Sequence, residues 1–222
     1  MIPPDHDPAF VAAMEDVLTV YAQPPDPARP LVCFDEKSKV LTGDVRPPQP
    51  AMPGRAARQD TEYQRNAVEG QANLLLACAP HLGWRHSTVT PARTAIEVAH
   101  ALRALVDEHF PQAERIVLVT DHLNVHTPAS LYRAFPPAEA RRIAAKLEWH
   151  YTPTHGSWLN MAELELSVLS RQCLKRRIPD RATRQAETAA WVAARNAAAT
   201  RILWRLTLDV ARVRLAHVYP EL

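Results

Sequence analysis

The sequence holds 222 residues with a formal net charge of +2, 20 prolines and only 5 glycines. Hydrophobic residues make up 47% of it and charged residues 23%, which are globular averages and exclude a disordered or fibrous chain. Apolar runs fall short of the roughly 18 residues that a membrane span needs. The first residues do not resemble a signal peptide, so we expect a soluble cytoplasmic protein with no membrane contact.

Cysteine spacing and charge distribution narrow the possible partners. Cys33, Cys78 and Cys173 are odd in number and form no CxxC pair, so a disulfide framework or structural zinc site is not expected. Residues 171–184 hold six basic residues and one acid, a local charge of +5 on a slightly acidic body. The net charge alone is a weak indicator of nucleic-acid binding, but this patch favours it.

The first 65 residues predict one helix, one strand and two irregular segments. Residues 10–22 favour a short helix, and seven prolines among the first 30 residues predict an extended linker. The apolar run 31–43 is typical of a strand. Four further prolines within residues 46–65 predict a long irregular loop.

The middle of the chain alternates strands and helices. Residues 73–80 and 84–90 predict two strands joined by a turn at Gly83. Thr90 and Pro91 predict the start of a helix, with Thr90 as its N-cap. The buried face of this helix is expected to carry Ile96, Ala99, Leu102, Val106 and Phe110.

The second half begins with the clearest buried strand, residues 116–120 (IVLVT). Helical turns follow over residues 129–146, broken at Pro136-Pro137, and residues 147–151 predict a last short strand. From residue 157 onward only helices are expected. They cover residues 158–176, 181–196 and 208–216. This order predicts an α/β domain with a mixed sheet flanked by helices and a helical C-terminal region.

Three carboxylates lie where open α/β sheets bind ligands. Asp35 is expected to end the strand LVCF, Asp121 directly follows IVLVT, and Glu163 lies early in a predicted helix. Carboxylates brought together there suit Mg²⁺ or Mn²⁺. Two such ions clamp the attacking and leaving oxygens of an in-line phosphodiester displacement. Helical periodicity does not choose between Glu163 and Glu165, which flank the buried stripe on opposite sides.

The segments around these acids resemble DDE transposases. They are FDEKSK at Asp35, TDHLNVHTP at Asp121 and HYTPTHGSWLNMAELELSVLSRQ at Glu163. The chain is most similar to transposases of bacterial insertion sequences related to the mariner elements, often described as DDE superfamily endonucleases. The resemblance implies a ribonuclease-H-like fold and a two-metal Mg²⁺ or Mn²⁺ site. Asp35, Asp121 and Glu163 would be its catalytic, metal-ligating residues, and Glu165 is the alternative third acid.

The same resemblance implies a function and a domain organisation. Residues 1–30 would be an N-terminal helix and linker, 31–184 the catalytic domain, and 185–222 a helical extension packed on it. The domain would nick double-stranded DNA at transposon ends and join the freed 3′-hydroxyl to target DNA. It would act as a homodimer in a synaptic complex in the bacterial cytoplasm, at the nucleoid when DNA-bound. Full-length relatives carry helix-turn-helix modules ahead of this domain, which a separate chain would supply here.

Basic residues near the acids are candidates for DNA contacts. Lys37 follows Asp35 by two residues, so on a strand it shares the same face. Beyond the third acid, phosphate contacts are expected from Lys175, Arg176, Arg177 and Arg181. The alternative interpretation of the second group is a solvated helix end.

Other interpretations stay open. His122 stands where the family usually has asparagine, which together with the short N-terminal region suggests a truncated relic that binds DNA or a partner transposase without catalysis. A nuclease acting on RNA–DNA hybrids is a third possibility. Zinc binding by His122 and His126 is disfavoured because these residues lie in a predicted loop. Ser157 is predicted to cap the following helix rather than act as a nucleophile.

Overall fold

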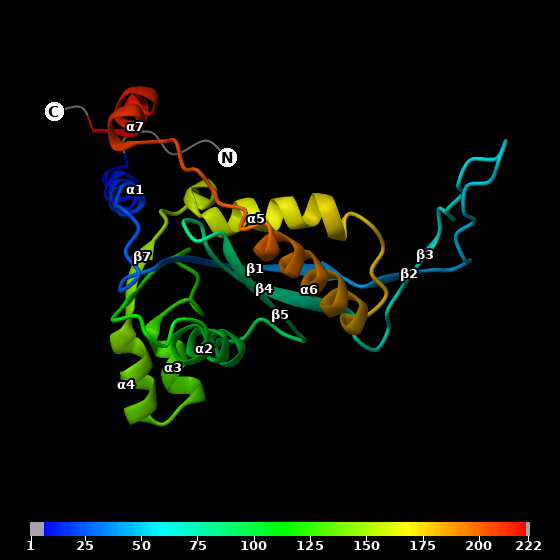
Figure 1. Cartoon of the computed structure of the whole chain (residues 1–222), viewed down its shortest axis with the longest axis horizontal. Coiled ribbons are helices and arrows are strands. Elements are labelled where there is room, and N and C mark those ends of the chain that lie inside the picture. The colour runs from blue at the N-terminus through cyan, green and yellow to red at the C-terminus, as the bar shows by residue number, and fades with distance from the viewer. Residues whose placement is uncertain (1–6, 221–222) are drawn as a thin grey trace.

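Five strands form a mixed sheet at the centre of the structure, a computed structural model that describes residues 7–220 (Figure 1). Their order is β5-β4-β1-β6-β7, with β1 antiparallel to β4 and parallel to β6. The strands are β1 (Leu31–Val40), β4 (Gln71–Ala79), β5 (Trp84–Thr90), β6 (Ile116–Thr120) and β7 (Leu147–Tyr151). The predicted α/β class and mixed sheet are confirmed. Residues 1–6 of the predicted N-terminal segment and residues 221–222 of the predicted C-terminal segment lie outside the described residues.

Helices cover both faces of this sheet (Figure 1). One face packs against α2, α3 and α4, the other against α1, α5 and α7, and α6 lies along β5. The helices are α1 (Pro8–Tyr21), α2 (Ala95–Ala104), α3 (Pro128–Ala134), α4 (Pro137–Lys146), α5 (Met161–Leu169), α6 (Arg181–Ala197) and α7 (Leu208–Arg214). Turns of π-helix follow α2 at Leu105–His109 and α5 at Ser170–Leu174, and 3₁₀ turns occupy Ser157–Leu159 and Ala216–Val218.

Strand β1 carries the first candidate acid within its length. The strand pairs with β6 only as far as Cys33 opposite Val119, and then continues to Val40 against β4 alone. The prediction that the strand ends at Asp35 is therefore wrong, because antiparallel pairing with β4 extends it. Extending the β1–β6 register by two residues aligns Asp35 with Asp121, so the two acids lie at the same edge of the sheet.

Two predicted helix starts are wrong. Helix α2 begins at Ala95, where Thr94 and Glu97 form a reciprocal capping box, and Thr90 instead ends β5. As a result Ile96 lies half exposed on the outer side of the helix rather than in the core. Helix α5 is capped by Asn160 rather than Ser157, because a 3₁₀ turn separates Ser157 from the helix.

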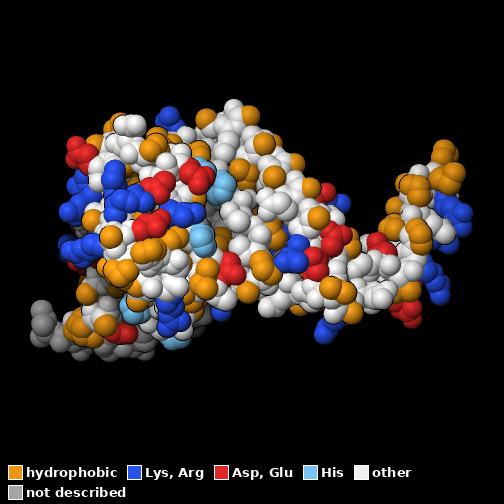
Figure 2. Space-filling model, turned by 90° about the horizontal axis from the view of Figure 1, so that it is seen from below, with side chains coloured by type: hydrophobic (Ala, Val, Ile, Leu, Met, Phe, Trp, Pro, Cys, Tyr) orange, Lys and Arg blue, Asp and Glu red, His pale blue; other side chains and the backbone are white. Residues whose placement is uncertain are grey.

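A long arm projects from the sheet between β1 and β4 (Figures 1 and 2). Its base is the two-stranded pairing of β2 (Thr42–Asp44) with β3 (Tyr63–Arg65). The bridge between Gln49 and Arg58 continues the arm toward an exposed tip. The predicted loop over residues 46–65 is thus largely confirmed, although its last residues pair as a strand.

The helices predicted for the C-terminal region are present, with shifted ends. The predicted helix over residues 158–176 is divided into a 3₁₀ turn, α5 and the π-turn that ends at Leu174. The segment 198–207, which no predicted helix covers, contains no helix. Ala211 and Val218 are nevertheless buried in the same hydrophobic cluster as α1 and α5. Among the described residues, no helix is long and apolar enough to cross a membrane.

Candidate active site

Asp35 is a buried carboxylate that has no cationic partner within residues 7–220. Its side chain belongs to a residue only 4% exposed, and it accepts hydrogen bonds from the backbone N–H of Glu36 at 2.7 Å and from Asn160 Nδ2 at 3.1 Å. Burial raises the pKa of Asp35 to about 8, and the negative charges of Glu163, Glu36 and Asp121 add to this rise. Burial and the neighbouring carboxylates therefore disfavour the ionised form of Asp35 in the folded chain.

Asp121 lies just beyond β6 and is held by a buried histidine. His126 Nδ1 is 2.5 Å from Asp121 Oδ1, and His126 Nε2 is 2.7 Å from Glu36 Oε2. Burial favours the neutral imidazole, but these two carboxylates outweigh it and raise the pKa of His126 to about 9. The imidazolium in turn holds the pKa of Asp121 below its usual value despite partial burial. This bridge fixes Asp121 beside the strand that carries Asp35.

The structure distinguishes the two candidate third acids. Glu165 is 2% exposed and bonded to two arginines: Arg85 Nε at 2.7 Å and Arg195 Nη2 at 2.8 Å. Burial raises its pKa, but these guanidinium groups outweigh burial and hold it below the usual range. The charge of Glu163, in the first turn of α5, instead acts on Asp35. Glu165 is thus an ion-paired core residue, and Glu163 is the helix acid that faces the site.

The donor set suits a hard divalent cation. The groups around Asp35 offer carboxylate oxygens, and a cation there would supply the positive charge that the buried Asp35 lacks. Within residues 7–220, however, no three His, Cys, Asp or Glu side chains are already gathered closely enough to hold a metal ion. The residues fit the group chemically, and the acids are not preassembled around it.

A small cavity of about 230 Å³ opens beside Asp121. The segment after β7, from Thr152 to Ser157, lines its other side. Gly156 is required here, because a Cβ at this position would lie 2.5 Å from Pro153 Cγ. His122 is exposed at the cavity, with its ring edge-on to Tyr151 at 4.8 Å. The exposed imidazole therefore does not displace the bridge that His126 makes to Asp121.

The structure divides the predicted DNA contacts into two groups. Arg176, Arg177 and Arg181 each pair with a carboxylate, from Glu187, Asp44 and Glu69 respectively. Lys37 and Lys175, by contrast, line a basic groove between β1 and the end of α5. Only the second group is available for a phosphate without breaking an ion pair.

The structure shows three residues that orient the candidate acids and that the sequence alone did not identify in this role: Glu36, His126 and Asn160. Asn160 caps α5 through Ala162 and also donates to Asp35 and to the carbonyl of Phe34, so it ties the helix start to β1. Its position at a helix start is a recognisable signal. The pairing of His126 with Glu36 has no sequence signal, because 90 residues separate the two.

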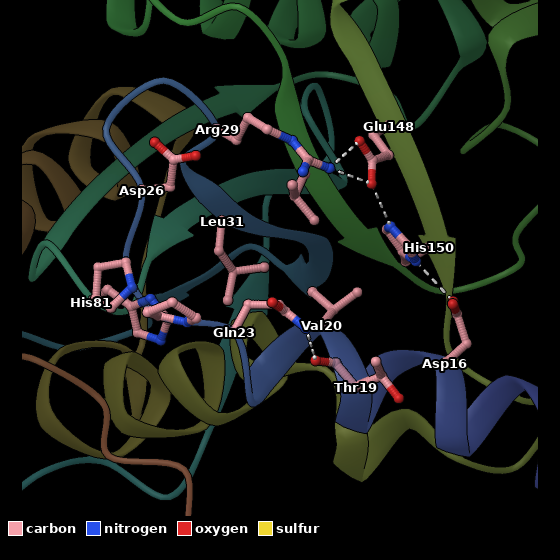
Figure 3. Close-up of a pocket in the computed structure, with 13 residues that line it drawn as sticks. Asp16, Thr19, Val20, Gln23, Asp26, Arg29, Leu31, His81, Glu148 and His150 are labelled. Carbon is pink, nitrogen blue, oxygen red and sulfur yellow. Dashed lines mark hydrogen bonds and ion pairs between the residues drawn. The ribbon is translucent and has the colours of Figure 1, made fainter.

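A second cavity, of about 440 Å³, lies at the other end of the strands from the candidate acids, where β1 and β6 begin (Figure 3). Its polar groups form a chain in which Arg29 bonds to Glu148 at 2.7 Å, and His150 lies 3.4 Å from Glu148 and 2.7 Å from Asp16 (Figure 3). These contacts fasten α1 to β7. None of the three candidate acids lines this cavity.

Comparisons with solved structures show the fold. The chain is similar to the Mos1 mariner paired end complex with Mn (TM-score 0.56, 16% identity), covering 87% of this chain and 58% of that one. It is similar to the Mos1 strand transfer complex (TM-score 0.58, 13% identity), covering 87% and 57%. The catalytic domain of Mos1 mariner transposase is matched over its whole length and 92% of this chain, at 11% identity and a TM-score of 0.56. The predicted ribonuclease-H-like architecture is thereby confirmed.

The family is established by sequence. No curated protein matches the chain. The model of the DDE superfamily endonuclease family matches residues 30–184, more than two thirds of the sequence. This range includes all three candidate acids and the residues that orient them. The chain belongs to the DDE superfamily endonucleases.

Proposed function

We propose that this chain is the catalytic domain of an insertion-sequence transposase, which cleaves DNA at transposon ends and transfers the strand to target DNA. The observation that carries the proposal is the buried, cation-free Asp35, aligned with Asp121 and acted on by the charge of Glu163. A carboxylate buried in this way is unfavourable unless a cation joins it, which is the arrangement expected of a metal-dependent nuclease.

Asp35, Asp121 and Glu163 would hold Mg²⁺ or Mn²⁺, two ions in the complete site. The ions would activate water and then the 3′-hydroxyl for attack on a phosphodiester. His126 positions Asp121 through Nδ1, and Asn160 positions Asp35 through Nδ2. Lys37, on the same face of β1 as Asp35, would meet the phosphate backbone beside the cleaved bond.

The partners are proposed from the same reasoning. Two of the similar structures are a paired end complex and a strand transfer complex of Mos1. We propose that this chain likewise acts on transposon-end and target DNA as a homodimer, in the bacterial cytoplasm. The match to this chain spans about 58% of the Mos1 chain in the paired end complex. Residues 31–184 would form the catalytic domain and 185–222 its extension.

Nicking of DNA tests the proposal. The substrate is a duplex that carries the inverted repeats flanking the gene, incubated with the purified chain and Mn²⁺ and resolved on a denaturing gel. We expect nicking that requires Mn²⁺ or Mg²⁺ and is lost in Asp121→Ala and Glu163→Gln. Nicking that survives Asp121→Ala would overturn the mechanism. A gel shift with no nicking would support the non-catalytic relic, and preferential cleavage of an RNA–DNA hybrid would support the hybrid nuclease.

A further inference from the structure

A basic groove lies beyond the catalytic acids, between β1, the π-turn after α5 and the first turn of α6. The groove has a volume of about 430 Å³. Its charged lining residues are Lys37, Lys39, Arg171, Lys175 and Arg184, with no acid among the lining residues. We call it the β1–α6 groove. A cavity with five cations and no carboxylate is suited to an anion.

Arg184 forms the floor of the groove. It is 0% exposed, and its guanidinium donates to the carbonyls of Ala72 and Lys37 while its buried Nε has no partner. Burial lowers the pKa of Arg184 to about 10, so the side chain still carries its charge at neutral pH. A buried guanidinium that meets only carbonyls leaves its positive charge uncompensated.

The other cations of the groove are equally free of acidic partners. Across residues 7–220, none of the five forms an ion pair with a carboxylate, in contrast to the neighbouring Arg176, Arg177 and Arg181. Burial and the charge of Arg184 both lower the pKa of Lys39, which shows that like charges have accumulated here. The ion-paired arginines hold the arm and α6 in place, and the unpaired cations are left for a ligand.

The groove continues directly from the catalytic acids. Side chains alternate along a strand, so Asp35, Lys37 and Lys39 share one face at intervals of about 7 Å. On the helix side, Arg171 follows Glu163 by eight residues, a rise of about 12 Å. One strand of duplex DNA carries a phosphate for every 3.4 Å or so of helix axis. By this measure Lys37, Lys39 and Arg171 lie roughly two to four nucleotides from a bond held at the acids.

We propose that the β1–α6 groove binds the phosphodiester backbone of the DNA strand, two to four nucleotides from the bond that is cut. This inference rests on the proposed function, because it takes its register from the acids. Arg184 provides the fixed charge at the base of the groove, and Lys39, Arg171 and Lys175 close over the backbone. The contacts read no base, so they supply affinity and register rather than sequence preference.

The test compares two triple variants with equal loss of charge. Lys39→Gln/Arg171→Gln/Lys175→Gln alters the groove and leaves the buried Arg184 and the acids intact. Its matched control is Arg115→Gln/Arg133→Gln/Arg141→Gln, three exposed residues before β6 and on α3 and α4. Binding of a labelled duplex is followed by fluorescence anisotropy in EDTA, and folding of each variant is checked by thermal melting.

We expect the groove variant to bind at least about tenfold more weakly than the wild type, with the slope of log K against log salt reduced by two or more between about 50 and 200 mM. For the control variant, the slope of log K against log salt should fall by less than one. Equal slopes for groove variant and control would overturn the inference. Displacement of the duplex from the wild type by millimolar inorganic phosphate would do so too, since it would indicate a free-anion site. A groove effect on binding in a chain that never nicks DNA would reject the proposed catalysis and, with it, the register of the groove, and would leave only backbone binding by the groove.

Discussion

At the scale of single residues, Asp35 dominates the electrostatics of the site. Its pKa of about 8 means that the folded chain retains a proton which the unfolded chain releases above about pH 4. The contribution of Asp35 to the free energy of unfolding of the metal-free protein therefore falls as the pH rises from about 4 to 8. A divalent cation removes this penalty by supplying the missing positive charge.

Asp35→Asn is expected to stabilise the metal-free protein at about pH 7.5 by on the order of 2 kcal/mol, since removing the buried charge outweighs the loss of one of the two hydrogen bonds that the carboxylate accepts. The gain should shrink toward zero at about pH 4. Urea denaturation in EDTA at both values measures this, with the exposed Glu114→Gln as the control. An Asp35→Asn protein less stable than the wild type at the higher pH contradicts the account.

A matched pair of variants tests which of the two glutamates of α5 is the third acid. Glu165→Gln leaves the buried Arg85 without a full counter-charge, so we expect it to lower the free energy of unfolding by about 3–5 kcal/mol. Glu163→Gln should change it by no more than about 0.5 kcal/mol and abolish nicking. Urea denaturation and the nicking assay together decide. The opposite pattern, in which Glu165→Gln leaves the protein stable but inactive, would make Glu165 the third acid.

At the scale of secondary-structure elements, the site depends on how α5 joins β1. Asn160 accepts from the backbone of Ala162 as the helix cap and donates to Asp35 and Phe34. One side chain therefore sets where the helix begins and how far it lies from the strand. This junction brings Glu163 toward Asp35, although 128 residues separate the two in the chain.

We expect Asn160→Ala to lower the free energy of unfolding by about 2–3 kcal/mol, about 1 from the cap and the rest from the lost donors. It should also raise the Mn²⁺ concentration needed for half-maximal nicking. Thr94→Ala, which removes only the cap of α2, should lose about 1 kcal/mol and leave the metal requirement unchanged. Equal metal requirements in the two variants would show that Asn160 has only a structural role.

At the scale of the whole molecule, the arm is separable from the body of the domain. Its residues are almost all exposed, and its base is held by Arg177, which bonds to Asp44 and to the carbonyls of Asp60 and Thr61. Figure 2 shows the arm extending away from the body, with basic side chains along it. Met52 is exposed at the tip.

Replacing residues 50–57 by Asn-Gly should form a tight hairpin below the Gln49–Arg58 bridge. Because little is buried there, we expect the free energy of unfolding to change by no more than about 0.5 kcal/mol in urea denaturation. Arg177→Gln, at the base of the arm, should instead speed proteolytic cutting within residues 46–62. A destabilised tip variant would indicate that the tip packs on the body.

Local patterns predicted most of the secondary-structure elements and singled out the candidate acids. The strand Ile116–Thr120, the break at Pro136 and the start of α6 follow from apolar runs and proline chemistry, which act over a few neighbouring residues. Those same local rules placed a helix start at Thr90 and a cap at Ser157, because Thr, Ser and Pro suit several turns equally well. The resemblance to DDE transposases depended on short contiguous segments, so it too could be recognised without knowledge of the fold.

Long-range packing decided the rest. Periodicity left Glu163 and Glu165 equivalent until Arg85 and Arg195, distant in sequence, bound one of them as an ion-pair partner. The sequence likewise does not distinguish the residues of the basic patch. In the part of the chain that the structure describes, Glu69, Asp44 and Glu187 neutralise three of its arginines by ion pairing and leave the others unpaired. A local sequence pattern shows which side chains can ionise. The role of each charge depends on its burial and on its ion-pair partners, and both are set by segments, distant in sequence, that the sheet brings together.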